Sequence, residues 1–471
     1  MKTIKTIAFL ILVLASHYSF SQCWKEVAAG INHTLAIRTD GTLWAWGLND
    51  KGQLGDGTTV NKNVPTQIGT DTDWAIIDAE YYNSIALKAN RTLWVWGENE
   101  FGQIGNGNFG NGVISNTPTQ IGIDTDWVKI SSGGHRSYAL KSNGTIWGWG
   151  NNLEGHLGIG NTNPHYTPFQ IGTASDWLDI NAGLNQILAI KTNHTLWGWG
   201  LNISGSLAIG PSFEPSVITV PAQTGNNTAD WEKVNVGGCC NSKMIKTDGS
   251  LWAMGAGSFG NLGTGDTQDL NTPTKIGVDT DWKMITNNNH SCALKNNGNF
   301  WAWGINFQGQ LGDGTNNNSS TPTHVATDLS WKNVVASLFH TVAITSDGSL
   351  YTWGSNNIGQ LGDGTFENRN TPTLIGASCT LGTTGFNTVK SIQVYPNPAT
   401  SMTTLSYTLK EKSTITLTIT NTLGQIVYKK NKTNSLGENQ ESIDLSSFSS
   451  GVYLISLQTT NEQNTIKVVK N

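Results

Sequence analysis

Residues 24–58 read WKEVAAGINHTLAIRTDGTLWAWGLNDKGQLGDGT, and residues 64–69 close the same unit with VPTQIG. Residues 331–365 read WKNVVASLFHTVAITSDGSLYTWGSNNIGQLGDGT, and TPTLIG follows at 371–376. A tryptophan starts each copy of this unit, at intervals of about 50 residues: Trp24, Trp74, Trp127, Trp177, Trp231, Trp282 and Trp331. Seven copies fill residues 24–376, and this repetition decides the architecture.

Each copy has the pattern of four strands. In the first copy, strands are expected at residues 24–29, 33–38 and 42–46, with a fourth around 65–68. Asp40-Gly41 lies between two β-rich runs and predicts a tight hairpin in which both turn residues have positive φ. Pro65 has no N–H to donate, so the fourth strand is expected at a sheet edge.

Four antiparallel strands repeated seven times predict an all-β fold, a seven-bladed β-propeller in which radial repetition protects the strand edges. An all-β solenoid is the alternative. A solenoid needs atypical capping repeats, however, whereas the two terminal copies here are among the most regular.

At this level of detail the repeat resembles the regulator of chromosome condensation family. The resemblance rests on the His-x-x-Ala strand, the Asp-Gly turn, the Leu-Trp-x-Trp-Gly run and the Gly-Gln-Leu-Gly-x-Gly loop, and it covers all seven copies. It implies a closed propeller over residues 22–379. Kelch repeats have a similar length but begin with paired glycines that are absent here.

The composition changes after the last repeat. Residues 380–391 are predicted to be a polar linker, and period-two alternation at 414–419 predicts strands of a small β-sandwich over residues 392–471. This module resembles the type A sorting domain of the type IX secretion system, through YPNPA at 395–399, LGQIV at 423–427, GVY at 451–453 and the basic tail at 467–470. The resemblance implies the type IX secretion machinery as a partner and a secreted or surface protein of a Gram-negative bacterium. An accessory sandwich that binds a ligand is the alternative.

Residues 1–21 have the pattern of a signal peptide. Lys2 and Lys5 precede an apolar stretch at 7–15, and Ser19 and Ser21 provide small residues for cleavage. The stretch is shorter than the roughly 20 apolar residues that a membrane anchor needs. A lipoprotein cut before Cys23 is disfavoured because Gln22 is bulky.

Two of the five cysteines flank the propeller. Cys23 precedes the first repeat and Cys379 follows the last, so a closed ring in an oxidising compartment predicts a disulfide between them. For Cys239, Cys240 and Cys292 two alternatives stay open: a link from the adjacent pair to Cys292, or an adjacent pair that is joined or free.

Nothing in the chain points to catalysis or to a cofactor. The net charge of -5 argues against a nucleic-acid partner, and no catalytic or phosphate-binding motif occurs. His33, His290 and His340 share one repeat position and are interpreted as structural residues, not as metal ligands. An extracellular hydrolase would need paired acids, for which Glu80, Glu154 and Glu214 are available.

Differences between the copies indicate where a ligand binds. They concentrate in the loops between the first and second strands and between the third and fourth strands, which share one face. The candidate contact residues there are Tyr81, Tyr82, Phe109, His135, Arg136, Leu184, Phe213, Leu338 and Phe339. Aromatic residues and Arg on one rim suit a protein or glycan surface. We therefore expect a monomeric secreted binding protein; the alternatives are an extracellular enzyme or a secreted enzyme inhibitor.

Overall fold

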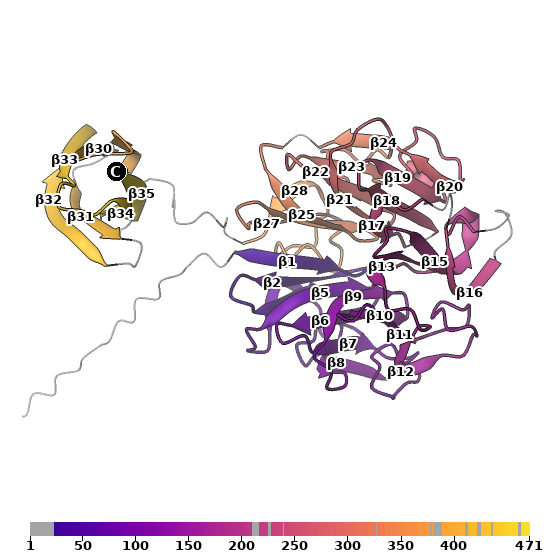
Figure 1. Ribbon diagram of the computed structural model, residues 1–471. Helices are drawn as coiled ribbons and strands as arrows, with labels where there is room; N and C mark the ends of the chain where they lie inside the picture. Colours follow the sequence, from indigo (N-terminus) through magenta and orange to yellow (C-terminus); the bar gives the residue numbers. More distant parts are fainter. Residues whose placement is uncertain are drawn as a thin grey trace, which may run out of the picture. The chain divides into compact units, whose positions relative to one another are not determined.

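The computed structural model describes residues 23–209, 216–224, 228–238, 240–325, 327–376, 379, 389–409, 413–421, 425–434, 437–459 and 463–471. Apart from two single 3-10 turns, η1 (Ile203–Gly205) and η3 (Ser258–Gly260), the regular elements of this part are β-strands (Figure 1), so the predicted all-β class is confirmed. The chain divides into two compact units, one spanning Gln22–Cys379 and the other including Thr380–Asn471. The expected signal peptide lies outside the described residues.

The first unit consists of seven four-stranded antiparallel sheets, one for each repeat. The first four blades are β1 (Trp24–Ala29), β2 (His33–Arg38), β3 (Leu43–Gly47), β4 (Lys62–Ile68); β5 (Trp74–Glu80), β6 (Asn83–Lys88), β7 (Leu93–Glu98), β8 (Ile114–Gln120); β9 (Trp127–Gly133), β10 (Arg136–Lys141), β11 (Ile146–Gly150), β12 (His165–Gln170); and β13 (Trp177–Ala182), β14 (Gln186–Lys191), β15 (Leu196–Asn202), β16 (Ser216–Gln223). The last three are β17 (Trp231–Val236), β18 (Asn241–Lys246), β19 (Leu251–Gly255), β20 (Leu270–Lys275); β21 (Trp282–Asn287), β22 (His290–Lys295), β23 (Phe300–Gly304), β24 (Ser319–His324); and β25 (Trp331–Ala336), β26 (His340–Thr345), β27 (Leu350–Gly354), β28 (Arg369–Leu374). Pro65 lies in β4 at a sheet edge, as predicted.

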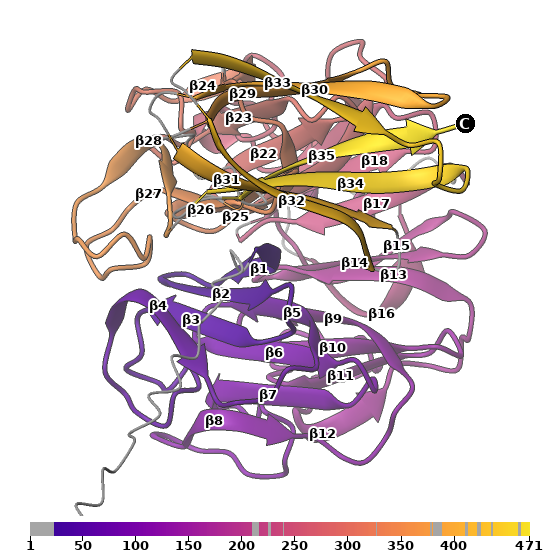
Figure 2. The same ribbon diagram turned by 90° about the vertical axis from the view of Figure 1, so that its left-hand side faces the viewer.

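The seven sheets close into a ring. The first strand of each blade contacts the first strand of the next, and β25 contacts β1 where the ends of the repeat array meet (Figures 1 and 2). The propeller is therefore confirmed, and the solenoid alternative is excluded.

The hydrophobic core lies between neighbouring blades and is built by two motifs of the repeat. The second tryptophan of Trp-x-Trp-Gly is buried and reaches the Gly-rich loop of the preceding blade: Trp96 Nε1 donates to the Gln53 carbonyl at 2.9 Å, and Trp46 Nε1 donates to the Gln360 carbonyl at 3.0 Å. A Cβ on Gly55 would lie 2.7 Å from Trp96 Nε1, so this loop position requires glycine. Trp149, Trp303 and Trp353 donate in the same way, so the two motifs are joined by this hydrogen bond at five of the seven interfaces of the described part. In blade five Met254 replaces the tryptophan.

The hairpin turns between the second and third strands differ from the prediction. Only the second turn residue has positive φ, as at Gly41 with φ 80°, while Asp40 uses its carboxylate to accept from the Thr42 N–H and hydroxyl. In the two copies without glycine, Arg91 (φ 65°) and His194 (φ 63°) take this left-handed position, rather than the preceding Asn. The expectation that both residues are left-handed was wrong because a side-chain cap, not a second left-handed residue, completes the turn.

The cysteines close the ring as predicted. Cys23 and Cys379 form a disulfide with their Cα atoms 5.1 Å apart. Cys292 is a buried free thiol, so the alternative of a link from the adjacent pair to Cys292 is wrong. Cys239 lies outside the described residues.

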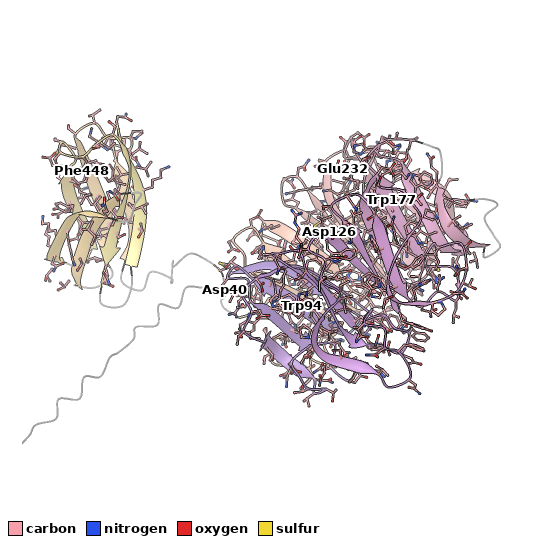
Figure 3. The ribbon with its side chains drawn as sticks, turned by 60° about the horizontal axis from the view of Figure 1, so that its bottom comes forward. Asp40, Trp94, Asp126, Trp177, Glu232 and Phe448 are labelled. Carbon is pink, nitrogen blue, oxygen red and sulfur yellow. A yellow bond between two sulfur atoms is a disulfide. The ribbon has the colours of Figure 1, made fainter. Side chains whose placement is uncertain are left out.

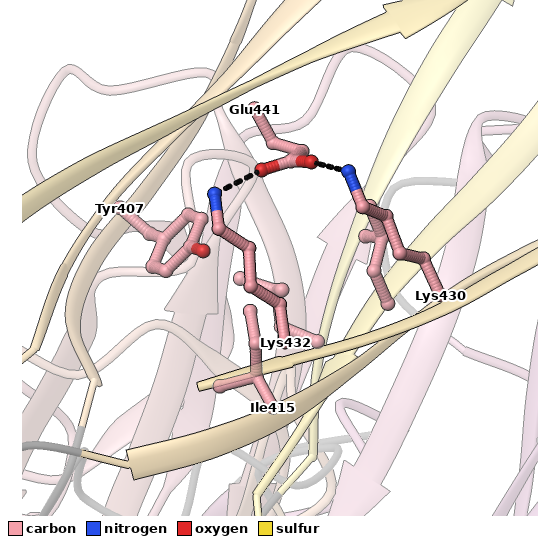
Figure 4. A pocket seen from close by; sticks show the side chains of 7 residues that line it. Tyr407, Ile415, Lys430, Lys432 and Glu441 are labelled. Atoms are coloured by element: carbon pink, nitrogen blue, oxygen red, sulfur yellow. Dashed lines mark hydrogen bonds and ion pairs between the residues drawn. The ribbon is translucent and has the colours of Figure 1, made fainter. Parts of the chain in front are cut away.

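The C-terminal unit is a β-sandwich, as expected. One sheet contains β29 (Val389–Tyr395), β30 (Met402–Leu409) and β33 (Gly437–Asp444), and the other contains β32 (Ile426–Asn434), β31 (Ser413–Asn421), β34 (Gly451–Gln458) and β35 (Gln463–Lys470). Apolar side chains from both sheets form one core. At its rim Glu441 of β33 pairs with Lys430 and Lys432 of β32, Lys432 at 2.9 Å (Figure 4). None of the helices in the described part is long and apolar enough to cross a membrane.

Candidate functional site

The loop face is the face of the propeller that carries the loops between first and second strands and between third and fourth strands. Antiparallel order places both sets of loops at the same end of each blade. Four aromatic rings of this face come together in blades two and three and form what we call the aromatic cluster: Tyr81, Tyr82, Phe101 and His135.

The rings of the aromatic cluster are in mutual contact. Tyr81 packs edge-on against Tyr82 and His135 with centroids 5.3 and 5.2 Å away, and Phe101 lies 4.6 Å from His135. Neither tyrosine hydroxyl has a hydrogen-bond partner within the described ranges. Tyr81 has a φ of 53°, a left-handed conformation that is strained for a bulky residue. Strain of this kind concentrates at functional positions.

A buried carboxylate, Glu98, holds His135 of the aromatic cluster. Glu98 is 6 % exposed, and its Oε2 lies 3.0 Å from His135 Nδ1 and accepts from Gln103 Nε2 at 3.1 Å. Lys51 of the first blade lies 4.0 Å from the same carboxylate. Burial, with Asp50, Tyr81 and Glu98 nearby, raises the pKa of Tyr82, so its phenol is a neutral donor at physiological pH. The cluster therefore offers apolar rings together with polar edges.

The other candidate contact residues lie elsewhere. Phe109 is 51 % exposed and stacks on Tyr166 with centroids 3.7 Å apart. Arg136 is buried, and its guanidinium donates to the Gly133 and Leu184 carbonyls, so it is committed to joining blades three and four. Phe213 lies outside the described residues.

Half-buried leucine and phenylalanine side chains occupy the first loops of blades four and seven. Leu184, Leu338 and Phe339 are all half-buried, and no ring contact joins Phe339 to the aromatic cluster in the described part. Ser337 beside them donates to the Gly30 carbonyl at 2.6 Å and so joins blades seven and one. These side chains pack against the propeller more than they project from its loop face.

The three histidines at one repeat position join blades. His33 Nε2 lies 3.1 Å from Ser84 Oγ, His290 Nε2 lies 2.7 Å from Thr341 Oγ1, and His340 Nε2 lies 3.0 Å from Thr34 Oγ1. Burial lowers the pKa of each to about 3, so all three are neutral. No cluster of three or more His, Cys, Asp or Glu side chains able to hold a metal exists among the described residues.

The acids considered for a hydrolase lie in different environments. Glu80 ends β5, and burial together with Asp78 on the same strand raises its pKa to about 8. The Asn288 side chain of the sixth blade acts in the opposite direction and lowers the pKa of Glu80. Glu154 is exposed beside His156, 3.6 Å away, and Glu214 lies outside the described residues.

Two residues of this region escaped sequence analysis, although comparison of the copies contained the signal. Glu98 occupies a position where other copies have uncharged residues such as Leu48, Ala256 and Ile305. Phe101 lies in the third-to-fourth loop where the first copy has Lys51. Both residues could have been found by looking for an acidic or aromatic side chain that occurs at a repeat position where other copies have a different type of residue.

Two kinds of sequence family match the chain. The RCC1-like domain matches residues 12–288, more than half of the chain, and the regulator of chromosome condensation (RCC1) repeat matches residues 297–344 and 347–394. The secretion system C-terminal sorting domain matches residues 393–471.

Individual relatives match over shorter stretches. The ultraviolet-B receptor UVR8 of Arabidopsis thaliana is 28 % identical over 141 residues, which are 29 % of this chain and 31 % of the receptor. The Ras guanine nucleotide exchange factor C of Dictyostelium discoideum is 38 % identical over 47 residues, 10 % of this chain and 3 % of that protein. The chain thus spans less than a third of the length of these curated relatives.

Solved structures share the fold. Human WBSCR16 has a TM-score of 0.62 at 22 % identity, covering 69 % of this chain and 86 % of its own. Prp20p of Saccharomyces cerevisiae has a TM-score of 0.63 at 19 % identity, covering 74 % and 88 %. Together with the repeat motifs and the closed ring, these matches show that the chain belongs to the RCC1-like domain family and ends in a secretion system C-terminal sorting domain.

Proposed function

We propose that this protein is a non-enzymatic binding protein, exported by type IX secretion, that recognises an extracellular protein through the aromatic cluster of its loop face. The sorting domain identifies a secreted or cell-surface protein of a Gram-negative bacterium. In this proposal residues 1–21 direct the chain to the periplasm, residues 22–379 bind the partner, and residues 380–391 connect the propeller to the sorting sandwich.

The observation that carries the proposal is the strained, edge-packed Tyr81 with an uncommitted hydroxyl. Aromatic anchors of this kind, rigid and amphipathic, dominate protein interfaces. Lys51 supplies a charged group at the margin of the cluster, as interface rims do, and His135 within the cluster presents an imidazole held by the buried Glu98. A secreted enzyme inhibitor would be one case of this function. The structurally similar Prp20p of Saccharomyces cerevisiae has binding properties to Gsp1p and histones, which illustrates protein recognition by this fold.

Capture from the natural surroundings tests the proposal. The full chain, immobilised, should retain a protein from culture medium or host secretions, and Tyr81→Ala and Tyr82→Ala should each reduce retention at least tenfold. Phe339→Ala on the seventh blade is the matched aromatic control and should leave retention unchanged. Undiminished retention by both tyrosine variants, at an unchanged melting temperature, would rule out the aromatic cluster as the site.

A further inference from the structure

A second group of exposed rings lies on the loop face at blades five and six. Phe259 in η3 and Phe307 in the following blade are 49 % and 56 % exposed, and they contact each other edge-on with centroids 5.9 Å apart. Together they form the phenylalanine pair. Neither position is aromatic in the first copy, where Lys51 and Asp50 occupy the equivalent places.

The backbone of the phenylalanine pair is strained at Phe259. Phe259 has a φ of 60°, and Ser204 of the preceding blade is the one other residue at this repeat position with positive φ in the described part. The left-handed conformation is unfavourable for a residue with a Cβ and usually requires glycine. Strain that leaves a large apolar ring in water points to use of that ring in binding.

An open groove runs beside the pair and is lined by neutral polar groups. Its lining consists of Ser258, Phe259, Thr267, Asn318 and Ser320. The groove is shallow and open, with a volume of about 560 Å³. It has no charged side chain, unlike the aromatic cluster with Lys51 and Glu98.

The hydrogen-bonding groups of the groove are uncommitted. Within the described ranges, the hydroxyls of Ser258, Thr267 and Ser320 have no hydrogen-bond partner. The Asn318 side chain accepts from the Asn306 N–H at 2.8 Å through Oδ1, which leaves its amide N–H groups available. Hydroxyls can donate and accept, so this lining matches a ligand that is itself rich in hydroxyls.

From this combination we infer that the phenylalanine pair and its groove form a subsite for an uncharged carbohydrate, such as a stretch of a neutral polysaccharide. The apolar C–H face of a sugar ring would pack on Phe259 or Phe307, and its hydroxyls would bond to Ser258, Thr267, Asn318 and Ser320. A charged polysaccharide or an acidic peptide would find no counter-charge in the lining. The inference rests on the proposed use of the loop face for binding but concerns a different site on it.

Affinity electrophoresis of the full chain tests this subsite. The gels contain neutral polysaccharides (β-glucan, mannan or xylan) or the acidic polysaccharide alginate. We expect retardation by at least one neutral polymer and none by alginate. The retardation should be equal at 0.1 and 0.5 M salt, because no charge contributes to it. Loss of retardation at high salt, or migration unaffected by every neutral polymer, would overturn the inference.

Variants then locate the site. Phe259→Ala and Phe307→Ala should each weaken binding at least tenfold, while Phe366→Ala, on the same face and 58 % exposed, is the matched control and should have no effect. Phe259→Gly removes the ring and relieves the backbone strain. It should therefore lose binding without lowering the melting temperature. If Phe259 had only a structural role, its loss would lower the melting temperature. Unchanged polysaccharide binding by the two alanine variants would refute this site. That result would leave the proposed protein binding through Tyr81 standing, because it concerns a different part of the loop face.

Discussion

Lys243 lies on β18 at a position that the other six blades fill with residues uncharged at neutral pH: Leu35, Ile85, Tyr138, Leu188, Cys292 and Val342. Its side chain is fully buried. Its Nζ donates to Asn241 Oδ1 at 2.9 Å and to Asn287 Oδ1 at 3.3 Å, and no carboxylate pairs with it within the described ranges. Withdrawal from water lowers the pKa of Lys243 to about 7.

This lysine makes stability depend on pH. The unfolded chain keeps the proton up to about pH 10, whereas the folded chain releases it near pH 7. Because the unfolded state binds more protons in this window, the free energy of unfolding should rise between pH 7 and 10, by on the order of 4 kcal/mol, and Lys243 should add no slope below pH 7.

Replacement of Lys243 should remove that dependence. Lys243→Leu restores the side-chain type of the other blades and should stabilise the chain at pH 7 by about 1–2 kcal/mol, after allowance for the two asparagine acceptors left without a donor. Denaturant unfolding at pH 7 and pH 9.5 measures both effects, with the exposed Lys275→Leu as control. A Lys243→Leu protein that is less stable at both pH values would contradict this account.

At the scale of the element, six blades share a stack of two tryptophans and a cation. The cation ends the second strand, one tryptophan begins the first strand and the other lies in the third; Trp94 and Trp177 in Figure 3 belong to two such stacks. In blade two, Lys88 Nζ lies 4.9 Å from the Trp74 centroid and 4.7 Å from Trp94, and it pairs with Asp71 at 2.6 Å. Blade seven has Thr345 in place of the cation.

Removal of the cation from one of these stacks should lower the free energy of unfolding by a measurable amount. Lys88→Met keeps the length of the stem but loses both ring contacts and the ion pairs, so we expect destabilisation of about 1–2 kcal/mol in thermal or denaturant unfolding. Lys88→Arg should be tolerated, because Arg38 occupies the same place in blade one, 3.8 Å from Trp44. Equal loss in both variants would show that the geometry of the ammonium, not its charge, matters.

Local patterns in the sequence predict these elements well, and long-range contacts less well. Trp24 and His33 mark the observed starts of β1 and β2, because periodicity and turn residues act within one blade. The third strand begins one residue later than predicted, at Leu43, because Asp40 caps Thr42 within the turn. The influence of Asn288 on the pKa of Glu80 and the burial of Lys243 depend on how different blades are arranged, which no single repeat encodes.

At the scale of the molecule, blade one is attached differently from the others. At five interfaces a first-strand side chain accepts from a backbone N–H of the next blade, as Asn181 Oδ1 does from Val236 at 2.7 Å. The other four acceptors are Asp78, Ser131, Asn235 and Thr286. Ala28 and Val335 occupy the equivalent places at the two interfaces of blade one, and neither side chain can accept a hydrogen bond. At the seam between blades seven and one, the Cys23–Cys379 disulfide adds a covalent link to the hydrogen bonds made by Trp46, Thr34 and Ser337.

Loss of the disulfide should loosen this seam first. Cys23→Ser should lower the melting temperature in non-reducing buffer, with a loss of up to about 6 kcal/mol from the loop entropy of a 356-residue separation. Hydrogen exchange should rise most in residues 24–69. Reductant should bring the wild type to the same melting temperature as the variant; an unchanged melt, or faster exchange in another blade, would contradict the role of the seam.

The two units have separate hydrophobic cores, and this separation makes export testable apart from folding. The sandwich core draws on residues 399–468, and none of its members belongs to the propeller. A chain that ends at residue 391 should therefore keep a folded propeller with its disulfide, because Cys379 is retained, yet lack the matched sorting domain. We expect this truncated protein to accumulate in the periplasm, with a melting temperature near that of the propeller in the full chain. Fractionation and immunoblotting of the native bacterium measure its location, and the full chain is the control. Export of the truncated protein at the wild-type level would show that residues 392–471 are not the signal for passage across the outer membrane.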